Sequence, residues 1–218
     1  AVTYIMVENS SEAAGLMASH FFGEPSRQLR LVGVTGTNGK TSCSHWYAEA
    51  MTILGKKTAI IGTLGNGFLH DLTYTANTTP DAILLQEILA GCLQEGAQNL
   101  AIEASSHGLV QGRLNGCEFA VAVLTNLSRD HLDYHKNMDG YAAAKAKLFF
   151  WPELKYAVLN LDDIFGVELV QQIRKKDLQI IGYGFNQSTA LPPGQSNLSL
   201  LSGSNLQASI HGLEFDIE

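Results

Sequence analysis

The chain has 218 residues and a formal net charge of -7, with 14 Lys and Arg against 21 Asp and Glu. A chain of this length can bury a full core, so we expect one sizeable domain with an appendage. The acidic balance, with no cationic cluster longer than Arg174–Lys176, argues against a nucleic-acid partner.

Cysteine usage and hydropathy favour a cytoplasmic location. Cys43, Cys92 and Cys117 are far apart and form no CxxC pair, which argues against a disulfide framework and against a zinc site. No apolar run is long enough to cross a bilayer and no signal peptide is recognisable, so we expect no membrane contact.

The predicted elements divide the chain near residue 28. A strand at 3–8 and a helix at 12–22, capped by Ser10 or Ser11, are interpreted as a connector (1–28) left from a preceding domain. From 29 to 218 strands and helices alternate, which predicts the main domain. The strands are predicted at 29–34, 58–62, 99–103, 118–125, 156–160 and 178–183, and the helices at 39–54, 81–95, 138–149 and 162–174.

Three segments depart from this alternation. The Gly-rich stretch 63–70 and the Ser-, Pro- and Gly-rich stretch 186–205 are predicted to be irregular, and 206–217 is predicted to be a β-hairpin. Short apolar strands separated by helices indicate an α/β fold, a mostly parallel sheet flanked by helices, with a small antiparallel addition near the C-terminus. Ligands of such sheets bind at the carboxyl ends of the strands.

The stretch Leu31–Ser42 carries the strongest chemical signal. A strand leads into a glycine-rich turn, and Lys40 and Thr41 begin a helix. Such a turn lets backbone N–H groups converge on phosphates, while Lys40 can pair with the outer phosphates and the Thr41 hydroxyl can bind Mg²⁺. Val34 stands where the standard pattern has its first glycine, so the loop is a variant. An ordinary structural turn is the alternative.

Polar clusters also follow two other predicted strands. Glu103 ends a buried strand, where a nucleotide-bound Mg²⁺ needs a ligand, although an acid facing water is the alternative. The segment 104–113 has adjacent Ser and His but no GxSxG elbow, and its closing Arg113 suits an anionic substrate better than a hydrolase. In 125–135 the best metal candidate is His131, and a structural histidine is the alternative.

Lys145 lies on an unexpected face of the helix predicted at 138–149. It shares the inward stripe with Tyr141 and Leu148 by i, i+4, i+7 spacing, whereas Lys147 points elsewhere. Such a lysine either snorkels or is functional. Desolvation lowers the pKa of an amine, and the neutral amine can react with CO₂ to give a carbamate, which is able to bind Mg²⁺.

Together these segments resemble the Mur ligases, the ATP-dependent amide ligases of peptidoglycan precursor synthesis. The resemblance rests on Thr35–Thr41, Asn77–Pro80, Glu103–Arg113, Thr125–His135 and Tyr141–Lys145. It runs from about residue 3 to the end, and the Ser-Ser-His and Gln-x-Arg block is most similar to the branch that makes UDP-N-acetylmuramoyl-tripeptide. The family implies an N-terminal UDP-binding domain, a central ATPase domain, which this chain resembles, and a C-terminal domain that brings the amino acid.

The resemblance implies a role for each motif. ATP phosphates would be held by Gly36, Thr37, Asn38, Gly39, Lys40, Thr41 and Ser42. One Mg²⁺ would be held by Thr41 and Glu103, and a second by His131 and carbamylated Lys145. Lys40, His131 and Lys145 would be catalytic. The substrate UDP-MurNAc-L-Ala-D-Glu would contact Asn77, Thr78, Thr79, Ser105, Gln111 and Arg113.

The implied reaction adds a diamino acid to the D-Glu carboxylate through an acyl phosphate. Meso-diaminopimelate is favoured, lysine is left open, and a monomer is expected. The UDP pocket would precede Ala1 and the adenine and amino-acid contacts would follow Glu218, so we expect this chain alone to bind nucleotide weakly without catalysing ligation.

Two other functions remain open at this point. One is a related ligase such as folylpolyglutamate synthetase, and the other is a nucleotide-binding module without turnover. A kinase or GTPase is disfavoured because no guanine-selecting Asn-Lys-x-Asp occurs.

Overall fold

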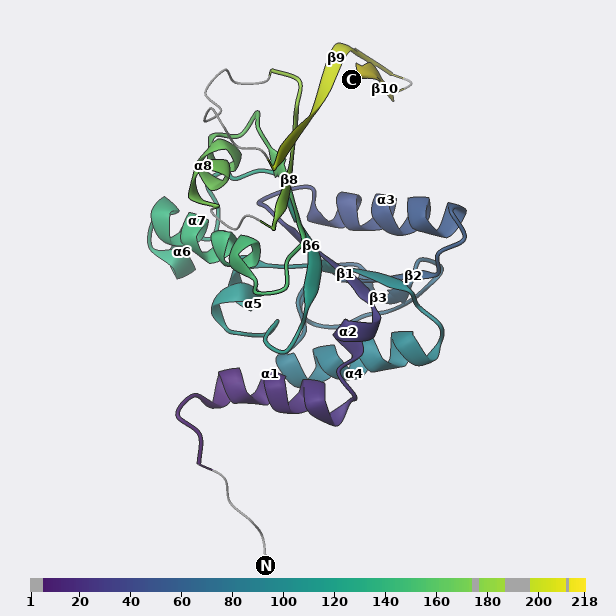
Figure 1. Cartoon of the computed structure of the whole chain (residues 1–218), viewed down its shortest axis with the longest axis vertical. Coiled ribbons are helices and arrows are strands. Elements are labelled where there is room, and N and C mark those ends of the chain that lie inside the picture. The colour runs from purple at the N-terminus through teal and green to yellow at the C-terminus, as the bar shows by residue number, and fades with distance from the viewer. Residues whose placement is uncertain (1–5, 174–176, 187–196, 211) are drawn as a thin grey trace, which may run out of the picture.

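Ten strands form one sheet in the part of the chain that the computed structural model describes, residues 6–173, 177–186, 197–210 and 212–218. The strands are β1 (Arg30–Thr35), β2 (Thr58–Gly62), β3 (Gly65–Phe68), β4 (Asp71–Thr73), β5 (Asn99–Glu103), β6 (Phe119–Leu124), β7 (Tyr156–Asn160), β8 (Gln179–Gly184), β9 (Leu198–Ser209) and β10 (Gly212–Ile217). The helices are α1 (Ser10–Phe21), α2 (Pro25–Gln28), α3 (Lys40–Ile53), α4 (Ala82–Gln94), α5 (Ser106–Val110), α6 (Leu132–His135), α7 (Met138–Ala146), the 3-10 helix η1 (Lys147–Phe150) and α8 (Ile164–Gln172). Figure 1 shows their arrangement.

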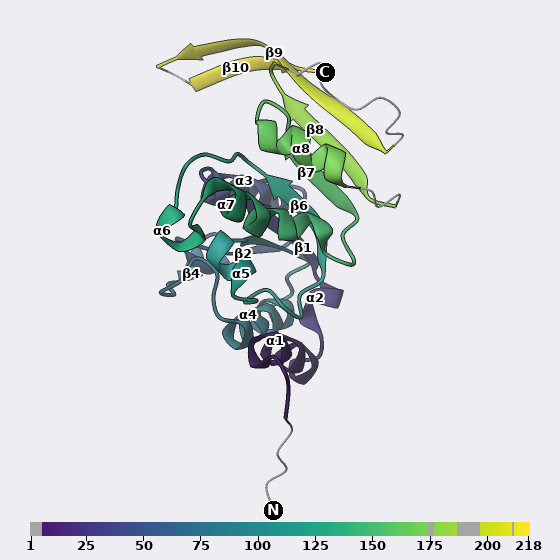
Figure 2. The same cartoon turned by 90° about the vertical axis from the view of Figure 1, so that its left-hand side faces the viewer.

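The strand order confirms the predicted α/β fold. It runs β10-β9-β8-β7-β6-β1-β5-β2-β3-β4, and the stretch from β8 to β2 is parallel throughout. At one edge β3 and β4 add antiparallel strands. At the other edge β9 pairs with β8 in parallel over 198–202 and then with β10 in antiparallel fashion. The β9–β10 hairpin projects from the body at the end opposite the N-terminus (Figure 2).

Helices cover both faces of the parallel strands because successive side chains of a strand point to opposite faces. On β2, Ala59 and Ile61 belong to the main core, which also includes Leu85 and Leu89 of α4. Ile60, between them, instead packs with Ala48 of α3. Figure 1 shows α3 on one side of β1 and β2 and α4 with α1 on the other. The continuous apolar runs of the strands therefore follow from burial on both faces.

The predicted irregular segments are partly wrong. Residues 65–68 and 71–73 form β3 and β4, because Gly65 (φ 136°) and Gly67 (φ 129°) allow the tight antiparallel pairing with β2 and β4. Residues 198–205 belong to β9, whose backbone is paired along its length despite a polar sequence. Most of the remainder, 187–196, lies outside the described residues, and the predicted hairpin at 206–217 is confirmed.

The N-terminal predictions need two corrections. The strand predicted at 3–8 is wrong over 6–8, which lack strand partners among the described residues, and 3–5 lie outside them. The cap of α1 is Asn9, whose Oδ1 accepts a hydrogen bond from the Glu12 amide at 3.2 Å, in place of Ser10 or Ser11. No helix in the described ranges is long and apolar enough to cross a membrane.

Two helical glycines give a matched test of the packing. A Cβ at Gly166 in α8 would lie 1.8 Å from the backbone oxygen of Asn160, whereas a Cβ at Gly91 in α4 would meet nothing within 4 Å. We expect Gly166→Ala to lower the free energy of unfolding by about 1–3 kcal/mol through overpacking. Gly91→Ala should raise it by up to about 1 kcal/mol, because alanine is the better helix former. Urea unfolding checks both, and equal effects would contradict the packing of α8.

Candidate active site

The predicted site residues converge at the carboxyl ends of β1, β5 and β6. A cavity of about 260 Å³ opens there, where the chain switches from the β5 side of β1 to the β6 side. This is the place at which open α/β sheets bind ligands. The predicted residues that line it are Thr37, Asn38, Gly39, Lys40, Thr41, Thr78, Glu103, Ser105, His131 and Lys145.

The turn after β1 requires its glycines. Gly36 has φ 150° and Gly39 has φ 82°, a region that residues with a Cβ rarely adopt. A Cβ at Gly36 would also lie 1.8 Å from the Thr125 Oγ1. Because Gly39 directly precedes α3, the turn delivers the backbone to the N-terminus of a helix, which favours anions.

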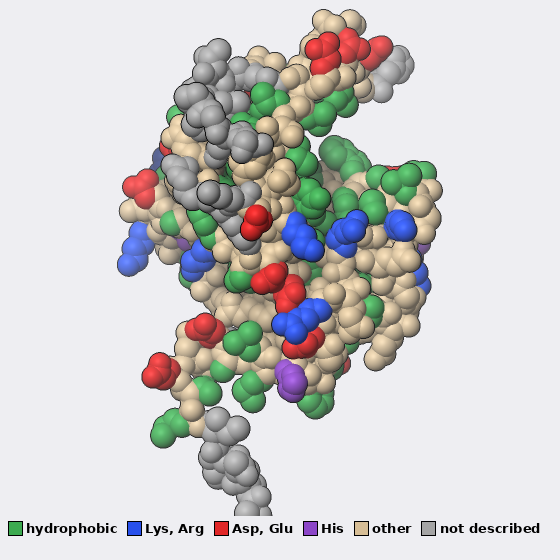
Figure 3. All heavy atoms as spheres, in the orientation of Figure 1, with side chains coloured by type: hydrophobic (Ala, Val, Ile, Leu, Met, Phe, Trp, Pro, Cys, Tyr) green, Lys and Arg blue, Asp and Glu red, His purple; other side chains and the backbone are tan. Residues whose placement is uncertain are grey.

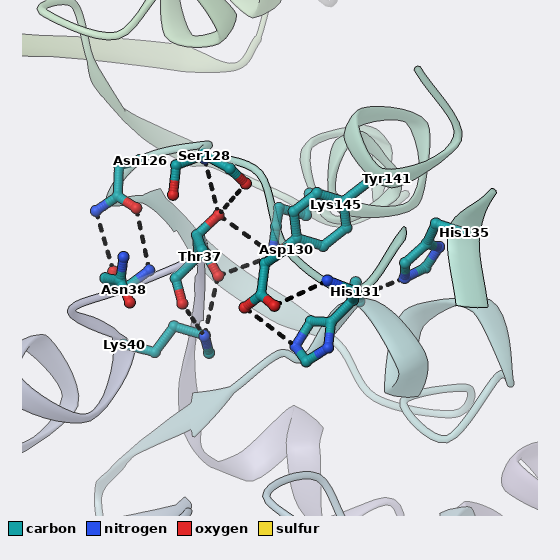
Figure 4. A network of polar contacts seen from close by, with 12 residues as sticks. Thr37, Asn38, Lys40, Asn126, Ser128, Asp130, His131, His135, Tyr141 and Lys145 are labelled. Carbon is teal, nitrogen blue, oxygen red and sulfur yellow. Dashed lines mark hydrogen bonds and ion pairs between the residues drawn. The ribbon is translucent and has the colours of Figure 1, made fainter. Parts of the chain in front are cut away.

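The segment after β6 clamps this turn (Figure 4). The Asn126 side chain accepts a hydrogen bond from the Asn38 amide and donates one to the Asn38 oxygen, at 3.0 and 3.1 Å. The Thr37 hydroxyl donates to the Ser128 oxygen (3.1 Å) and accepts from the Ser128 amide (2.9 Å). Thr125 donates to the Asn38 oxygen at 2.6 Å. These bonds hold the turn in one shape before any ligand is bound.

Lys40 folds back over the turn. Its amine donates hydrogen bonds to the oxygens of Gly36 (3.0 Å) and Thr37 (2.9 Å). Burial lowers the pKa of Lys40, and the carboxylates of Glu103 and Asp130 oppose this shift. A cation held by neutral carbonyls at the base of a polar cavity is well placed to receive phosphate oxygens.

Glu103 is buried at the end of β5 with 1% of its surface exposed. One carboxylate oxygen accepts hydrogen bonds from the hydroxyls of Thr41 (2.9 Å) and Thr63 (3.1 Å), and the other accepts from the Thr63 amide (2.9 Å). The predicted water-facing alternative is therefore wrong. A carboxylate and a hydroxyl side by side in a polar cavity form a fitting pair for Mg²⁺, which takes one or two carboxylates together with substrate phosphates.

Lys145 reaches the same cavity from α7 and is only 1% exposed. Its amine donates a hydrogen bond to the Gly36 oxygen (2.7 Å) and lies 4.4 Å from the centre of the Tyr141 ring. Burial, helped by the Lys40 charge and opposed by Asp130, lowers the pKa of Lys145 to about 7. The predicted inward stripe is confirmed, since Tyr141 and Leu148 are also buried and Lys147 is exposed.

His131 stands at the rim, next to other aromatic rings. It is the N-cap residue of α6, with φ 50°, and its Nε2 lies 3.6 Å from the Asp130 carboxylate. The His107 ring is 5.0 Å from it. Burial, with His131 as the next cause, lowers the pKa of His107. Within the ranges described, no three His, Cys, Asp or Glu side chains cluster as a metal-ligand set. A metal would therefore need ligands such as Thr41, phosphates or a modified Lys145.

Three further predicted substrate residues are linked by hydrogen bonds beside the cavity and form what we call the shelf: Thr79, Gln111 and Arg113. Thr79 donates to the Glu103 backbone oxygen (2.7 Å) and lies 2.8 Å from the Ser105 hydroxyl. Arg113 donates to the Thr79 oxygen (2.7 Å) and to the Gln111 side chain (2.8 Å). These bonds position Arg113 next to the carboxyl end of β5.

Ser42 and Asn77 are exposed and do not line the cavity. Thr63, Thr125 and Asn126 are site residues that the sequence analysis left without a role. Their common signal is a position just after a parallel strand. Thr63 directly follows β2, and Thr125 and Asn126 are the first two residues after β6.

Comparison with known proteins decides the family. The Mur ligase middle domain matches residues 34–217. The chain belongs to the Mur ligase family. A UDP-N-acetylmuramoyl-L-alanyl-D-glutamate–2,6-diaminopimelate ligase of Nitrosomonas europaea is 62% identical over 205 residues, covering 94% of this chain and 39% of that protein. A ligase of the same name from Chromobacterium violaceum is 53% identical, covering 86% of this chain and 38% of the other. The chain thus spans less than half the length of these relatives.

Solved structures agree with this Mur ligase assignment. A diaminopimelate ligase superposes with a TM-score of 0.81 at 37% identity, over 99% of this chain and 44% of that one. A folylpolyglutamate synthase of Mycobacterium tuberculosis, solved with ADP and AMPPCP, gives a TM-score of 0.70 at 17% identity, over 94% and 51% of the two chains. The second likeness extends to the fold alone.

The buried amine makes stability depend on pH. The pKa of Lys145 is about 7 in the folded chain and 10.5 ordinarily. Between these pH values the unfolded chain therefore binds more protons than the folded chain. The loss of stability caused by burying the charged amine is full below about pH 7 and disappears as pH rises to 10.5. We expect the free energy of unfolding of Lys145→Met, relative to the parent, to fall as pH rises across this window. Urea unfolding in CO₂-free buffer without Mg²⁺ measures it.

Lys147→Met is the matched control, because Lys147 is exposed two residues away. A difference between Lys145→Met and the parent that stays constant with pH would contradict the lowered pKa of Lys145.

Proposed function

We propose that this chain is the ATP-using central part of a ligase that joins meso-diaminopimelate to UDP-MurNAc-L-Ala-D-Glu. The convergence of Lys40, Glu103 and Lys145 on one cavity carries the proposal. The names of the two relatives support diaminopimelate over lysine. Residues 1–28 serve as a connector and 29–218 as the ATP-binding domain. We expect the enzyme to work as a cytoplasmic monomer.

ATP is the proposed phosphate donor. The turn from Gly36 to Ser42 would surround its phosphates with backbone N–H groups and the N-terminus of α3. Lys40 would exchange its two carbonyl partners for phosphate oxygens, which are stronger acceptors because they are charged. The ADP and AMPPCP of the folylpolyglutamate synthase structure support the use of ATP on this fold.

Mg²⁺ fits the oxygen pair of Thr41 and Glu103, and His131 with carbamylated Lys145 would hold a second ion. When bound, these ions would neutralise charge on the phosphates and on the transferring phosphoryl group. Glu103 keeps its position through Thr63, which leaves the Thr41 hydroxyl free to turn toward a metal.

The carbamate would form from CO₂ and the neutral amine of Lys145. The nitrogen attacks the carbon of CO₂, and the nitrogen then loses one proton to water. A buried cation becomes an anion that can accept hydrogen bonds, and repulsion from Lys40 becomes attraction. The lowered pKa supplies the neutral amine near pH 7, and the position beside Gly36 directs the new carboxylate into the cavity.

Two chemical steps complete the reaction, a displacement at phosphorus followed by one at the acyl carbon. The D-Glu side-chain carboxylate attacks the γ-phosphorus, the bond to ADP breaks, and an acyl phosphate forms. The amine of the diamino acid attacks the acyl carbon, phosphate leaves with the electron pair, and the amine loses a proton. Lys40 stabilises the transferring phosphoryl group by its charge, and the shelf of Thr79 and Arg113 orients the substrate.

A chimera tests the proposed reaction. This chain replaces the matching segment of the Nitrosomonas europaea relative, and ADP release is measured. We expect release to require both UDP-MurNAc-L-Ala-D-Glu and diaminopimelate. Lys40→Ala should lower kcat by about 10²–10³ through lost charge stabilisation, while the exposed Lys147→Ala should not change it. ADP release with a folate substrate would instead favour the folylpolyglutamate synthetase type, and binding without turnover would favour a nucleotide-binding module.

Thr63 tests the proposed metal site. Thr63→Val removes the hydroxyl bond to Glu103 and keeps the amide bond, so we expect about tenfold weaker binding of Mn²⁺, used in place of Mg²⁺ and followed by electron paramagnetic resonance with AMPPCP present. Thr63→Ser should restore the affinity. Thr58→Val is the control, because Thr58 is at the other end of β2 and its hydroxyl donates to the Lys56 oxygen. Equal Mn²⁺ affinity in all three variants would rule out this role for Thr63.

A further inference from the structure

A second cavity of about 500 Å³ lies at the amino ends of the parallel strands, at the opposite ends from the active-site cavity. Four of its lining residues are cationic, and none is Asp or Glu; the four are Arg27, Arg30, Lys56 and Lys155. We call it the amino-edge groove. It is separated from the active-site cavity by the length of β1, about 17 Å for six residues. No part of the proposed ligase reaction uses it.

The sheet topology explains why these cations gather. Arg30 is the first residue of β1, Lys56 comes two residues before β2, and Lys155 comes directly before β7. Two strand intervals separate β7 from β1, and two more separate β1 from β2. Since neighbouring strands are about 4.8 Å apart, the backbone positions that carry these three cations stand in a row with spacings of about 10 Å.

The row is not neutralised by the protein itself. Arg27 pairs with Glu24 and Glu118, but Arg30, Lys56 and Lys155 form no ion pair with any carboxylate in the described ranges. Figure 3 shows Lys and Arg side chains across the middle of one view of the molecule, with Asp and Glu side chains beside and below them. Glu118 directly precedes β6, which lies between β7 and β1, but its carboxylate is paired with Arg27. The groove therefore keeps an excess of positive charge in a chain whose net charge is -7.

A polar side chain adds a hydrogen-bond donor to the cationic groove. Asn99 lines the groove between Arg30 and Lys56 in the strand order, and it is only 3% exposed. Its Oδ1 accepts a long hydrogen bond of 3.5 Å from Tyr47, and its Nδ2 donates to no acceptor in the described part of the chain. A side-chain amide donor within a cationic groove can bond an oxygen of an anion.

The end of α3 does not cancel this potential. Helix C-termini are partly negative, and α3 ends beside the groove, where Met51 is among the lining residues. Its last carbonyls are satisfied, because the amides of Leu54, Gly55 and Lys56 donate to the oxygens of Ala50, Thr52 and Met51.

We propose that the amino-edge groove is a binding site for a small ligand that carries two or more linked phosphate groups. Linked phosphates carry more charge than a single phosphate and extend further along the row, from Arg30 toward Lys56 or Lys155. The volume suits a molecule of nucleotide size. Inorganic polyphosphate and a nucleoside polyphosphate share this chemistry.

Amide chemical-shift mapping of the 218-residue chain tests the proposal. Sodium tripolyphosphate is titrated without divalent metal, and we expect saturable shifts at Arg30, Lys56, Asn99 and Lys155. These are separate from any shifts at 36–42, so the outcome is independent of the proposed ligase function. The triple variant R30Q/K56Q/K155Q should weaken binding at the groove at least tenfold. A dispersed spectrum of this triple variant will show whether it is folded. The titration of the parent chain locates the site even without a variant.

The control variant R129Q/K136Q/K147Q removes the same charge from exposed positions outside the groove and should bind tripolyphosphate with the parent affinity. A parallel ATP titration separates the sources, because equal affinity at the groove identifies the phosphates alone and tighter binding identifies a nucleotide. Shifts confined to 36–42, or equal losses in both triple variants, would overturn the proposal. So would stronger groove shifts with an octaglutamate peptide than with tripolyphosphate.

Discussion

The carbonyl oxygen of Gly36 is the point on which the candidate active site depends. It accepts hydrogen bonds from Lys40 at 3.0 Å and from Lys145 at 2.7 Å, so it ties the phosphate turn to α7, 109 residues away in the chain. The buried amine of Lys145 thus shares its acceptor with Lys40, which also donates to the Thr37 oxygen. Burial and the Lys40 charge, opposed by Asp130, lower the pKa of Lys145 to about 7. An added anion would relieve this imbalance, which supports the proposed binding of phosphate and the proposed reaction of Lys145 with CO₂.

The parallel strands also explain why the two cavities differ in character. At the carboxyl ends, β1 and β5 deliver a glycine turn and the carboxylate of Glu103, while at the amino ends the same strands begin with Arg30 and Asn99. Every strand in a parallel sheet contributes its first residue to one edge and its last residue to the other. Polar and charged side chains that are far apart in the sequence therefore gather in two places, at the carboxyl ends and at the amino ends of the parallel strands.

The sequence predicted the parts of the site that local pattern determines. The glycine turn, Glu103 at a strand end and Lys145 on an inward stripe each follow from spacing within one element, and all three line the cavity. Thr63 was missed because its role depends on β2 lying next to β5, a pairing between distant segments. The β3–β4 hairpin was missed because its glycines, which were interpreted as loop residues, serve to bring backbones together.

The pairing of β2 with β5 determines where the Glu103 carboxylate lies. Ile61 pairs with Ile102, which places Gly62 beside Glu103, and a Cβ at Gly62 would lie 2.1 Å from the carboxylate oxygen. The carboxylate thus occupies the space that a side chain of β2 would fill, and the next residue, Thr63, holds both of its oxygens. A register shift of one residue between β2 and β5 would remove the space and the hydrogen bonds together. The accuracy of the proposed metal site therefore comes from the same parallel ladder that holds the core, so the site needs no flexible element to assemble it.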